Sequence, residues 1–267
     1  MIETVIHVHN RTQYLDRAVN AAVSSSRAAD SIVRISCNAS NESAYEVAKL
    51  VANRYGVHIT HSLATTAFEH LRDTVATSKA DYVCLLHDDD FVAPQYFHRL
   101  QILISRHPSA AGFAPGNDFL IEDRLHQASV RLRRPFMISF RYLALLYLLG
   151  RCGPPFPSII YRRDFALTVF SDQPMFNKYS DVPIVMEAAR KDLWIDPEIS
   201  FTYVIGEQND SRSVDFVARR RLKRWLLRQF LKPVISHRAY RTSNLFYFCG
   251  RFFKFRSSIP SQKRPVD

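Results

Sequence analysis

Three consecutive aspartates, Asp88, Asp89 and Asp90, follow the apolar run DYVCLLH. Their charges repel one another at short range, so a folded protein that keeps them together needs something to offset the repulsion. Mg²⁺ and Mn²⁺ prefer oxygen ligands, and Mg²⁺ is commonly held by one or two carboxylates together with the phosphates of a substrate. The stretch therefore predicts a divalent-cation site that also receives a nucleotide diphosphate. The alternative is a turn or a helix N-cap, where aspartate is common.

Strand and helix patterns alternate four times in roughly the first 107 residues, which predicts an α/β fold. Short apolar and β-branched runs predict strands at residues 2–8, 31–36, 57–60 and 82–86. A helix is expected after each strand, and Pro94 suits the first turn of the fourth helix. This order favours a parallel sheet with right-handed crossovers.

Polar clusters follow three of the predicted strands. They are His9-Asn10-Arg11, residues 37–40 and the three aspartates. In an open α/β sheet, ligands bind outside the carboxyl ends of the strands. We therefore expect the three clusters to lie along one edge of one sheet.

The second half of the chain has less regular patterns. We expect short strands at residues 158–161 and 201–205, and a helix at 181–190 with Pro183 in its first turn. The most apolar segment, residues 136–149, is shorter than the roughly 20 residues of a membrane span. It therefore predicts a buried or an interfacial helix.

The net charge of +11 comes from one end of the chain. Residues 212–267 hold 15 Lys and Arg against 2 Asp and Glu, whereas residues 1–211 are nearly neutral. Within this basic extension, residues 216–232 place apolar side chains at helical spacing among arginines, and residues 244–256 interleave aromatic and basic side chains. Such a surface suits an anionic membrane. The alternatives are nucleic acid and a helix that packs its apolar face on the domain while its charges are solvated.

The amino-acid composition argues against several other kinds of binding site and framework. Only 7 glycines are present, which argues against a glycine-rich phosphate loop, and the 4 cysteines lie far apart without a CxxC pair. A reducing cytosol therefore fits better than a disulfide framework or a zinc knuckle. The first ten residues, MIETVIHVHN, lack the pattern of a secretory signal, so we expect a cytoplasmic location.

Six motifs occur in the order found in family 2 glycosyltransferases with the GT-A fold, and the sequence resembles that family over about residues 2–211. The motifs are HVHNR (7–11), ISCNASNE (35–42), LLHDDDFVAP (85–94), PSIIYRRDFAL (157–167), YSDVPIVMEAAR (179–190) and YVIGEQNDS (203–211).

The resemblance implies both a fold and an activity. The fold would be a GT-A domain at residues 1–211, a Rossmann-like mostly parallel sheet flanked by helices, with a basic helical extension at 212–267. The activity would be transfer of a sugar from a nucleotide diphosphate-sugar, most simply a UDP-sugar, to a hydroxyl of a glycan or glycolipid. The resemblance further implies inversion, use of Mg²⁺ or Mn²⁺, and a place in polysaccharide biosynthesis. A lipid-linked acceptor would require attachment to the inner face of the cell membrane.

Carried over by position, the resemblance assigns roles to the aspartates. Asp89 matches the main metal ligand, and Asp90 a second ligand or a support. Asp88 would contact the ribose or the cation. His87, beside them, could orient the aspartates.

The resemblance also implies a set of residues that bind the nucleotide. His9, Asn10 and Arg11 fall where the first loop of the family touches the nucleotide. Asn38 stands where an aspartate usually recognises the base; its amide can still pair with a pyrimidine edge, because it both donates and accepts. Arg72, on the helix before the fourth strand, could reach the base or a phosphate.

Asp181 matches the catalytic base of the family. A sugar hydroxyl is a poor nucleophile, and a nearby carboxylate can accept its proton in the transition state. The alternative role, N-cap of the following helix, suits Ser180 or Asp181 equally. Both roles are compatible.

One departure concerns the segment that closes the nucleotide site. Many relatives have a histidine metal ligand where Gly206 stands here. Glu207 or Asn209 could substitute, or the cation could have fewer protein ligands. The departures at Gly206 and Asn38 also leave an inactive relative as an alternative.

Two other classes stay open at the level of sequence. A nucleotidyltransferase usually has a glycine-rich N-terminal loop with a basic residue, which HVHNRTQ lacks. A basic membrane- or nucleic-acid-binding protein would need only the extension at 212–267, and would leave the aspartates without a role.

Overall fold

The computed structural model describes residues 1–39, 41–64, 66–121, 124–127, 134–150, 153–172, 176–177, 179–205 and 215–231. The chain divides into two compact units, Met1–Leu226 and Leu227–Asp267. The predicted domain limits, 1–211 and 212–267, stay a prediction.

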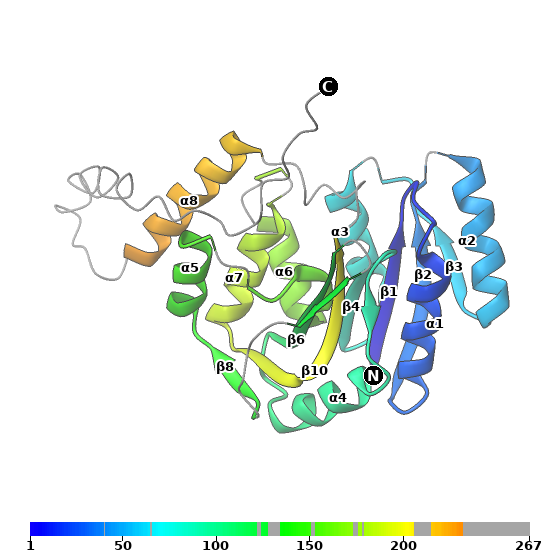
Figure 1. The fold of residues 1–267 in the computed structure, drawn as a ribbon, viewed down its shortest axis with the longest axis horizontal. Coiled ribbons are helices and arrows are strands. Elements are labelled where there is room, and N and C mark those ends of the chain that lie inside the picture. The colour runs from blue at the N-terminus through cyan, green and yellow to red at the C-terminus, as the bar shows by residue number, and fades with distance from the viewer. Residues whose placement is uncertain are drawn as a thin grey trace. The chain divides into compact units, whose positions relative to one another are not determined.

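A mixed sheet of 10 strands, counted over the described residues, forms the centre of the first unit (Figure 1). Its order is β3-β2-β1-β4-β9-β6-β10-β5, with β7 paired to β6 and β8 to β10. The strands are β1 (Ile2–Val8), β2 (Ser31–Cys37), β3 (His58–His61), β4 (Tyr82–His87), β5 (Phe91–Val92), β6 (Gly112–Ile121), β7 (Arg124–Gln127), β8 (Phe136–Ile138), β9 (Ile160–Arg162) and β10 (Leu193–Ile205).

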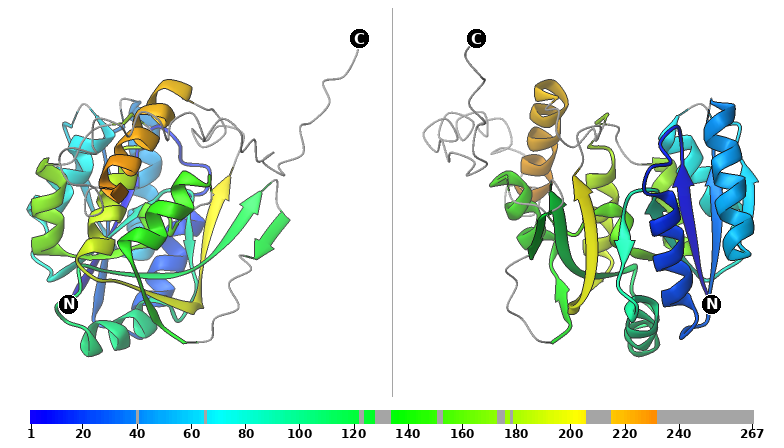
Figure 2. Two further views of the ribbon diagram at one scale, coloured as in Figure 1. Left: turned by 90° about the vertical axis from the view of Figure 1, so that its left-hand side faces the viewer. Right: turned by 45° about the vertical axis from the view of Figure 1, so that its right-hand side comes forward.

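Helices connect the strands and lie on both faces of the sheet (Figure 2). They are α1 (Leu15–Ser26), α2 (Glu42–Tyr55), α3 (Ala67–Thr77), α4 (Tyr96–Arg106), α5 (Phe140–Leu148), the 3₁₀ turn η1 (Phe156–Ser158), α6 (Arg163–Asp172), α7 (Asp181–Arg190) and α8 (Phe216–Leu231).

The predicted parallel sheet is confirmed in β3-β2-β1-β4, where every pairing is parallel. β1 is the central strand of this group, and its alternating side chains serve two layers. Ile2, Ile6 and Val8 join the hydrophobic core shared with α1 and α4. Glu3 and His7 point to the opposite face, where they contact Arg34 and Thr74. Both faces of this strand are therefore buried, as expected of a central strand in a parallel sheet.

Local sequence signals set the ends of the helices that lie beside the polar edge of the sheet. Asn41 caps α2 by accepting from the Ser43 N–H, and Gly56 ends that helix in the left-handed conformation. Thr66 and Glu69 form a capping box at the start of α3. Pro94 lies just before α4 rather than in its first turn, because Gln95 is the N-cap.

The second half differs more from the sequence-based expectation. β9 begins at Ile160 and runs antiparallel between β4 and β6, after the 3₁₀ turn η1. β10 begins at Leu193 instead of residue 201, with a register shift between Asp196 and Ser200. Charged residues and Pro197 give this stretch the composition of a loop, although it continues the sheet. β6 was not expected at all.

The apolar segment at 136–149 contains two elements rather than one helix. β8 pairs with the start of β10, and Ser139 then caps α5 by accepting from the Tyr142 N–H. α5 buries Leu143 and Ala144 and exposes other apolar side chains. Among the described residues, no helix combines the length and the apolar character needed to cross a membrane.

Candidate functional site

The three aspartates lie at the carboxyl end of β4, where the chain turns into the short strand β5. They are 5%, 7% and 0% exposed in chain order, which is unusual burial for neighbouring carboxyls. β5 pairs with β10, and the Val204 N–H donates to Asp90 Oδ1 over 3.0 Å. The end of β10 therefore covers the aspartates and fixes one oxygen of Asp90.

Charge repulsion and burial shift the pKa values of these carboxyls upward. Burial and the neighbouring Asp89 raise the pKa of Asp88 to about 7, although Arg11 opposes the shift. The pKa of Asp90 is raised well above its usual value by burial and then by Asp89. The Arg11 guanidinium lies 3.2 Å from Asp89 and 3.6 Å from Asp88, and its side chain is 43% exposed. The half-exposed Arg11 thus pairs with two of the three buried carboxyls.

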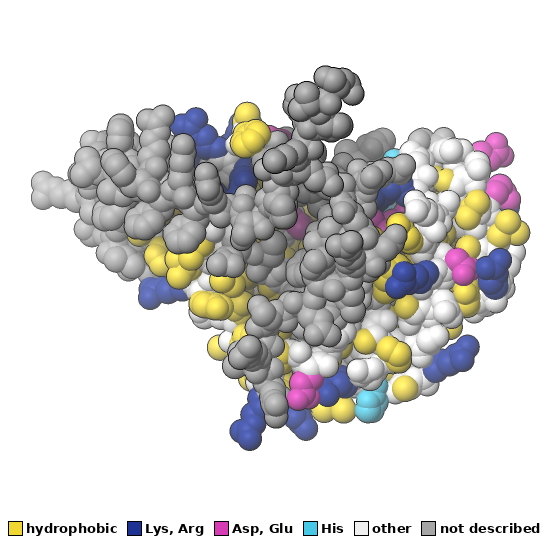
Figure 3. All heavy atoms as spheres, in the orientation of Figure 1, with side chains coloured by type: hydrophobic (Ala, Val, Ile, Leu, Met, Phe, Trp, Pro, Cys, Tyr) yellow, Lys and Arg dark blue, Asp and Glu magenta, His cyan; other side chains and the backbone are white. Residues whose placement is uncertain are grey.

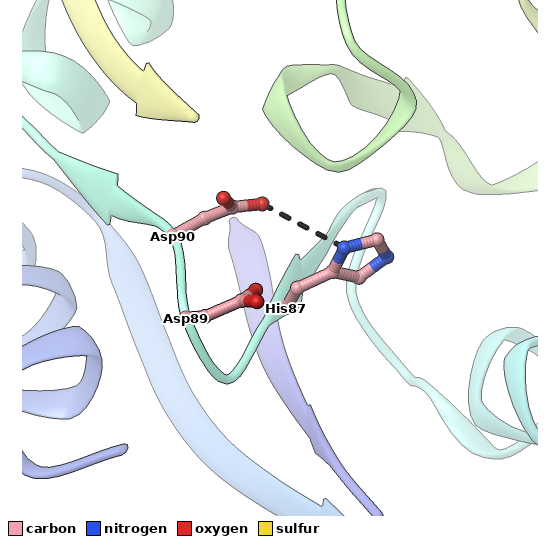
Figure 4. A group of neighbouring side chains, drawn as sticks. All are labelled: His87, Asp89 and Asp90. Atoms are coloured by element: carbon pink, nitrogen blue, oxygen red, sulfur yellow. Dashed lines mark ion pairs between the residues drawn. The ribbon is translucent and has the colours of Figure 1, made fainter. Parts of the chain in front are cut away.

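The second oxygen of Asp90, Oδ2, is buried without a hydrogen-bond partner. It faces His87 Nδ1 at 3.6 Å (Figure 4). Each of these residues, His87, Asp89 and Asp90, offers one potential ligand atom, and the three atoms lie within 4.8 Å of one another. Burial lowers the pKa of His87, so its neutral imidazole can offer a lone pair. These donors fit a divalent cation, and the unpartnered Oδ2 is the atom such an ion would satisfy.

His87 is the site residue whose role the sequence did not reveal. It was expected to orient the aspartates, whereas the structure groups its ring nitrogen with two of their carboxylates. A histidine that ends a strand is common, and its direction depends on the turn that follows. The position beside the aspartates was the only signal.

The predicted nucleotide-binding residues of the first two loops lie together. His9 Nδ1 is 3.1 Å from Asn38 Oδ1 and 3.2 Å from the Asn38 carbonyl oxygen. The amide of Asn10 lies 3.1 Å from His9 Nε2, and its oxygen accepts from the Asn41 N–H. One tautomer of His9, with the proton on Nδ1, satisfies all these contacts. The loops after β1 and β2 are therefore bound to each other, as their shared sheet edge predicts.

Arg72 lies apart from these contacts. Its exposed side chain is on α3 and forms an ion pair with Asp73 at 3.6 Å. The structure therefore brings together His9, Asn10 and Asn38, and separately Arg11 with the aspartates, but it does not join Arg72 to either group. Gly206, Glu207 and Asn209 lie outside the described residues.

A buried polar layer supports this edge from the α3 side. His70 Nε2 lies 2.7 Å from Ser36 Oγ, and His7 Nε2 lies 3.1 Å from Thr74 Oγ1. The two imidazole rings meet edge to face at 4.7 Å. Burial lowers the pKa of both, to about 4 for His70, so both are neutral near pH 7. The layer fixes α3 against β1 and β2 without adding charge.

Asp181 is the first residue of α7 and is half-buried. Ser180 is the N-cap, but its hydroxyl donates to the Asn177 carbonyl and gives no side-chain cap. Desolvation by the surrounding protein raises the pKa of Asp181 to about 6, although backbone N–H groups of the first turn oppose the shift. A carboxyl with this pKa is ionised at neutral pH and can accept a proton. Burial raises the pKa of the nearby Tyr161 hydroxyl, and the charge of Asp181 adds to this shift.

The fold is the GT-A fold of glycosyltransferases. The family described as "Glycosyltransferase like family 2" matches residues 2–215, and the chain belongs to this family. The predicted family, fold class and enzyme class are thereby confirmed. No curated protein matches the sequence.

Solved structures of TarS from S. aureus have the same fold. TarS 1–349 in complex with UDP-GlcNAc aligns with a TM-score of 0.67 at 12% identity, over 95% of this chain and 73% of that chain. TarS 1–349 in complex with UDP gives 0.58 at 10%, over 90% and 77%. A further TarS structure gives 0.62 at 13%, over 95% of this chain and 44% of that chain.

The raised pKa of Asp181 predicts how its replacement changes stability. Because the folded-state pKa is about 6 and the ordinary value is 3.8, the carboxyl favours folding below pH 3.8 and loses this advantage as pH rises through 6. Asp181→Asn should therefore raise the free energy of unfolding at pH 7.5, by at most about 3 kcal/mol, and by less at pH 4.5. Urea unfolding at the two pH values measures this difference.

Asp192→Asn, at the exposed turn after α7, is the control and should change stability little at either pH. If Asp181→Asn instead lowered stability equally at both pH values, Asp181 would act as a structural helix-terminal residue.

Proposed function

We propose that this glycosyltransferase moves a sugar from a UDP-sugar to a hydroxyl of a glycan or glycolipid, with inversion and with a divalent cation. The observation that carries the proposal is the group of His87, Asp89 and Asp90, in which a buried carboxylate oxygen has no partner. Buried charge of one sign is costly unless it is compensated, and a cation with a pyrophosphate would compensate it.

The cation would be held by Asp89 and Asp90, with His87 as a further ligand. When bound, Mg²⁺ or Mn²⁺ supplies a Lewis acid that neutralises charge on the departing diphosphate. The Val204 N–H fixes Asp90 Oδ1 and so leaves Oδ2 directed at the other donors. Asp88, whose carboxyl is paired with Arg11, would contact the ribose or the cation.

The nucleotide would lie over the loops after β1 and β2. His9, Asn10 and Asn38 already form one hydrogen-bonded group there, so the loops are ordered before a ligand arrives. Arg11, which lies beside Asp88 and Asp89, would contact a phosphate held there. Arg72 would reach the base or a phosphate from α3. The UDP and UDP-GlcNAc complexes of TarS, which has the same fold, support a uridine nucleotide.

Asp181 would act as the catalytic base. The acceptor oxygen attacks the anomeric carbon, the bond from that carbon to the diphosphate oxygen breaks, and the hydroxyl proton goes to the Asp181 carboxylate. One displacement of this kind inverts the anomeric centre. Half-burial with a pKa of about 6 gives a base that is ionised at neutral pH yet shielded from bulk water.

Loss of either carboxylate should abolish transfer. We expect Asp181→Asn to lower kcat by at least about 100-fold, since general-base catalysis alone contributes about 10²–10⁴. Asp89→Asn should lower kcat to a similar extent, because it removes a ligand of the cation that would neutralise the departing diphosphate. Wild-type kcat should fall as pH drops through about 6, because Asp181 becomes protonated. Release of UDP from a UDP-sugar with an acceptor measures both effects.

Asp192→Asn serves as the matched control, since it changes an aspartate at the other end of α7. Wild-type turnover by both site variants would contradict the assignment. Binding of membranes or nucleic acid without any turnover of nucleotide-sugars would favour the binding-protein alternative.

The acceptor is proposed to be presented at an anionic membrane surface on the cytoplasmic side. α8 buries Ala218, Leu222 and Leu226, so one face of this helix is packed inside the protein. Its other side carries exposed arginines, and its first turn exposes Phe216 and Val217 at 77% and 69%. α5 and its C-cap add exposed apolar side chains, and blue and yellow atoms are visible beside the grey region of Figure 3. These apolar side chains are Tyr142, Leu145 and Leu149.

Reversal of charge on α8 tests this surface. Arg220→Glu together with Arg221→Glu should weaken binding to vesicles that contain phosphatidylserine by about tenfold or more, because each basic residue near the surface contributes about 1 kcal/mol. Co-sedimentation at two salt concentrations measures the binding. Arg27→Glu, an exposed arginine after α1, is the control.

Unchanged binding to these vesicles would contradict a role for α8. Equal binding to neutral vesicles would contradict the electrostatic part of the proposal. Stronger binding to single-stranded nucleic acid than to vesicles would favour the nucleic-acid alternative.

A further inference from the structure

A tight turn lies immediately before Asp181. The Asn177 carbonyl accepts from the Ser180 N–H at 3.0 Å and from the Ser180 hydroxyl at 2.6 Å. Ser180 Oγ in turn accepts from the Phe176 N–H at 2.8 Å. Asn177 has a φ of 52°, the left-handed region that residues other than glycine seldom adopt. The turn therefore fixes the position of the backbone at Asp181, the first residue of α7.

The start of α8 binds this turn through one side chain. Asp215 Oδ1 accepts from the Ala218 N–H at 2.9 Å, which is the contact of an N-cap. Asp215 Oδ2 accepts from the Asn177 amide, also at 2.9 Å. A single carboxylate thus caps α8 with one oxygen and holds the turn before α7 with the other.

A second contact joins the same two segments. The ring of Phe176 packs against Trp225, with 5.9 Å between the centroids. Phe176 is buried and Trp225 is half-buried. Trp225 lies ten residues after Asp215, so α8 holds the turn at two points along its length. α7 itself is anchored by buried side chains that include Val182 and Ile184, so the Asn177–Asp215 contact acts on the turn that leads into the helix.

We propose that Asn177 and Asp215 are positioning residues, through which helix α8 holds Asp181 in place for proton transfer. The inference rests on the proposed role of Asp181 as the base. It makes the first part of the basic extension necessary for the reaction, in addition to any contact with a surface. Small misplacement of a catalytic group can lower a rate by about 100-fold, so a contact of this kind can matter to kcat.

Two variants remove the contact and keep the local backbone. Asn177→Gly removes the amide and retains a residue suited to positive φ. Asp215→Ser keeps a capping oxygen for α8 and removes the second acceptor. Each should lower kcat by about 10–100-fold and leave the KM for the UDP-sugar and the Kd for UDP within about twofold. A variant that merely loosened the fold would change donor binding as well.

Asp192→Gly is the matched control. Asp192 is the other described non-glycine residue with positive φ, at 68°, and its exposed side chain lies just after α7. Glycine there should leave kcat within about twofold of wild type. Equal loss of kcat in Asp192→Gly and Asn177→Gly would contradict the inference.

Exchange of the two side chains gives a rescue test. Asn177→Asp alone places two carboxylates against each other, whereas the pair Asn177→Asp with Asp215→Asn restores one donor and one acceptor. The double variant should recover most of the kcat lost by Asn177→Asp, so the two changes should be non-additive. Additive losses would overturn the inference.

Failure of the inference differs from failure of the proposed function. Inactive Asp181→Asn together with fully active Asn177→Gly and Asp215→Ser would overturn the positioning role and keep the base. Fully active Asp181→Asn would overturn the proposed base and, with it, this inference.

Discussion

Repulsion among three buried carboxyls is the constraint on which the rest of this site depends. Folding brings them to the end of β4 at a cost, and the described protein groups offset it only in part. Arg11 lies beside two of them from a half-exposed position, and one backbone N–H satisfies one oxygen of Asp90. The remaining oxygen is buried without a partner. A ligand that brings positive charge would offset the remaining cost.

Sheet topology explains why the other polar residues gather near these carboxyls. Parallel pairing of β1 with both β2 and β4 brings their carboxyl ends to one edge. Polar loops after β1 and β2 then bind each other through His9 and Asn38. The late strand β10 returns to cover the aspartates, and the late helix α8 holds the turn before Asp181. Segments from both ends of the family domain therefore contact the proposed site residues or the turn beside them.

Much of the first half could be predicted from the sequence because its signals are local. The strand at residues 2–8 has the predicted bounds, and the observed ends of the strands predicted at 31–36, 57–60 and 82–86 differ by at most one residue. The contacts that finish the site could not be predicted, since they join distant segments. Val204 and Asp90 lie 114 positions apart, and Asn177 and Asp215 lie 38 apart. The direction of the His87 side chain likewise depends on the turn between β4 and β5, and β5 pairs with the distant strand β10.

Calorimetry of UDP binding with and without Mn²⁺ tests the central claim most directly. If an ion and a pyrophosphate complete the buried carboxyls, Mn²⁺ should strengthen UDP binding to the wild type by at least about tenfold, or about 1.4 kcal/mol. Asp90→Asn, which keeps an oxygen for the Val204 N–H, should lose this dependence. Equal UDP affinity with and without Mn²⁺ in the wild type, or an undiminished Mn²⁺ effect in Asp90→Asn, would contradict the account.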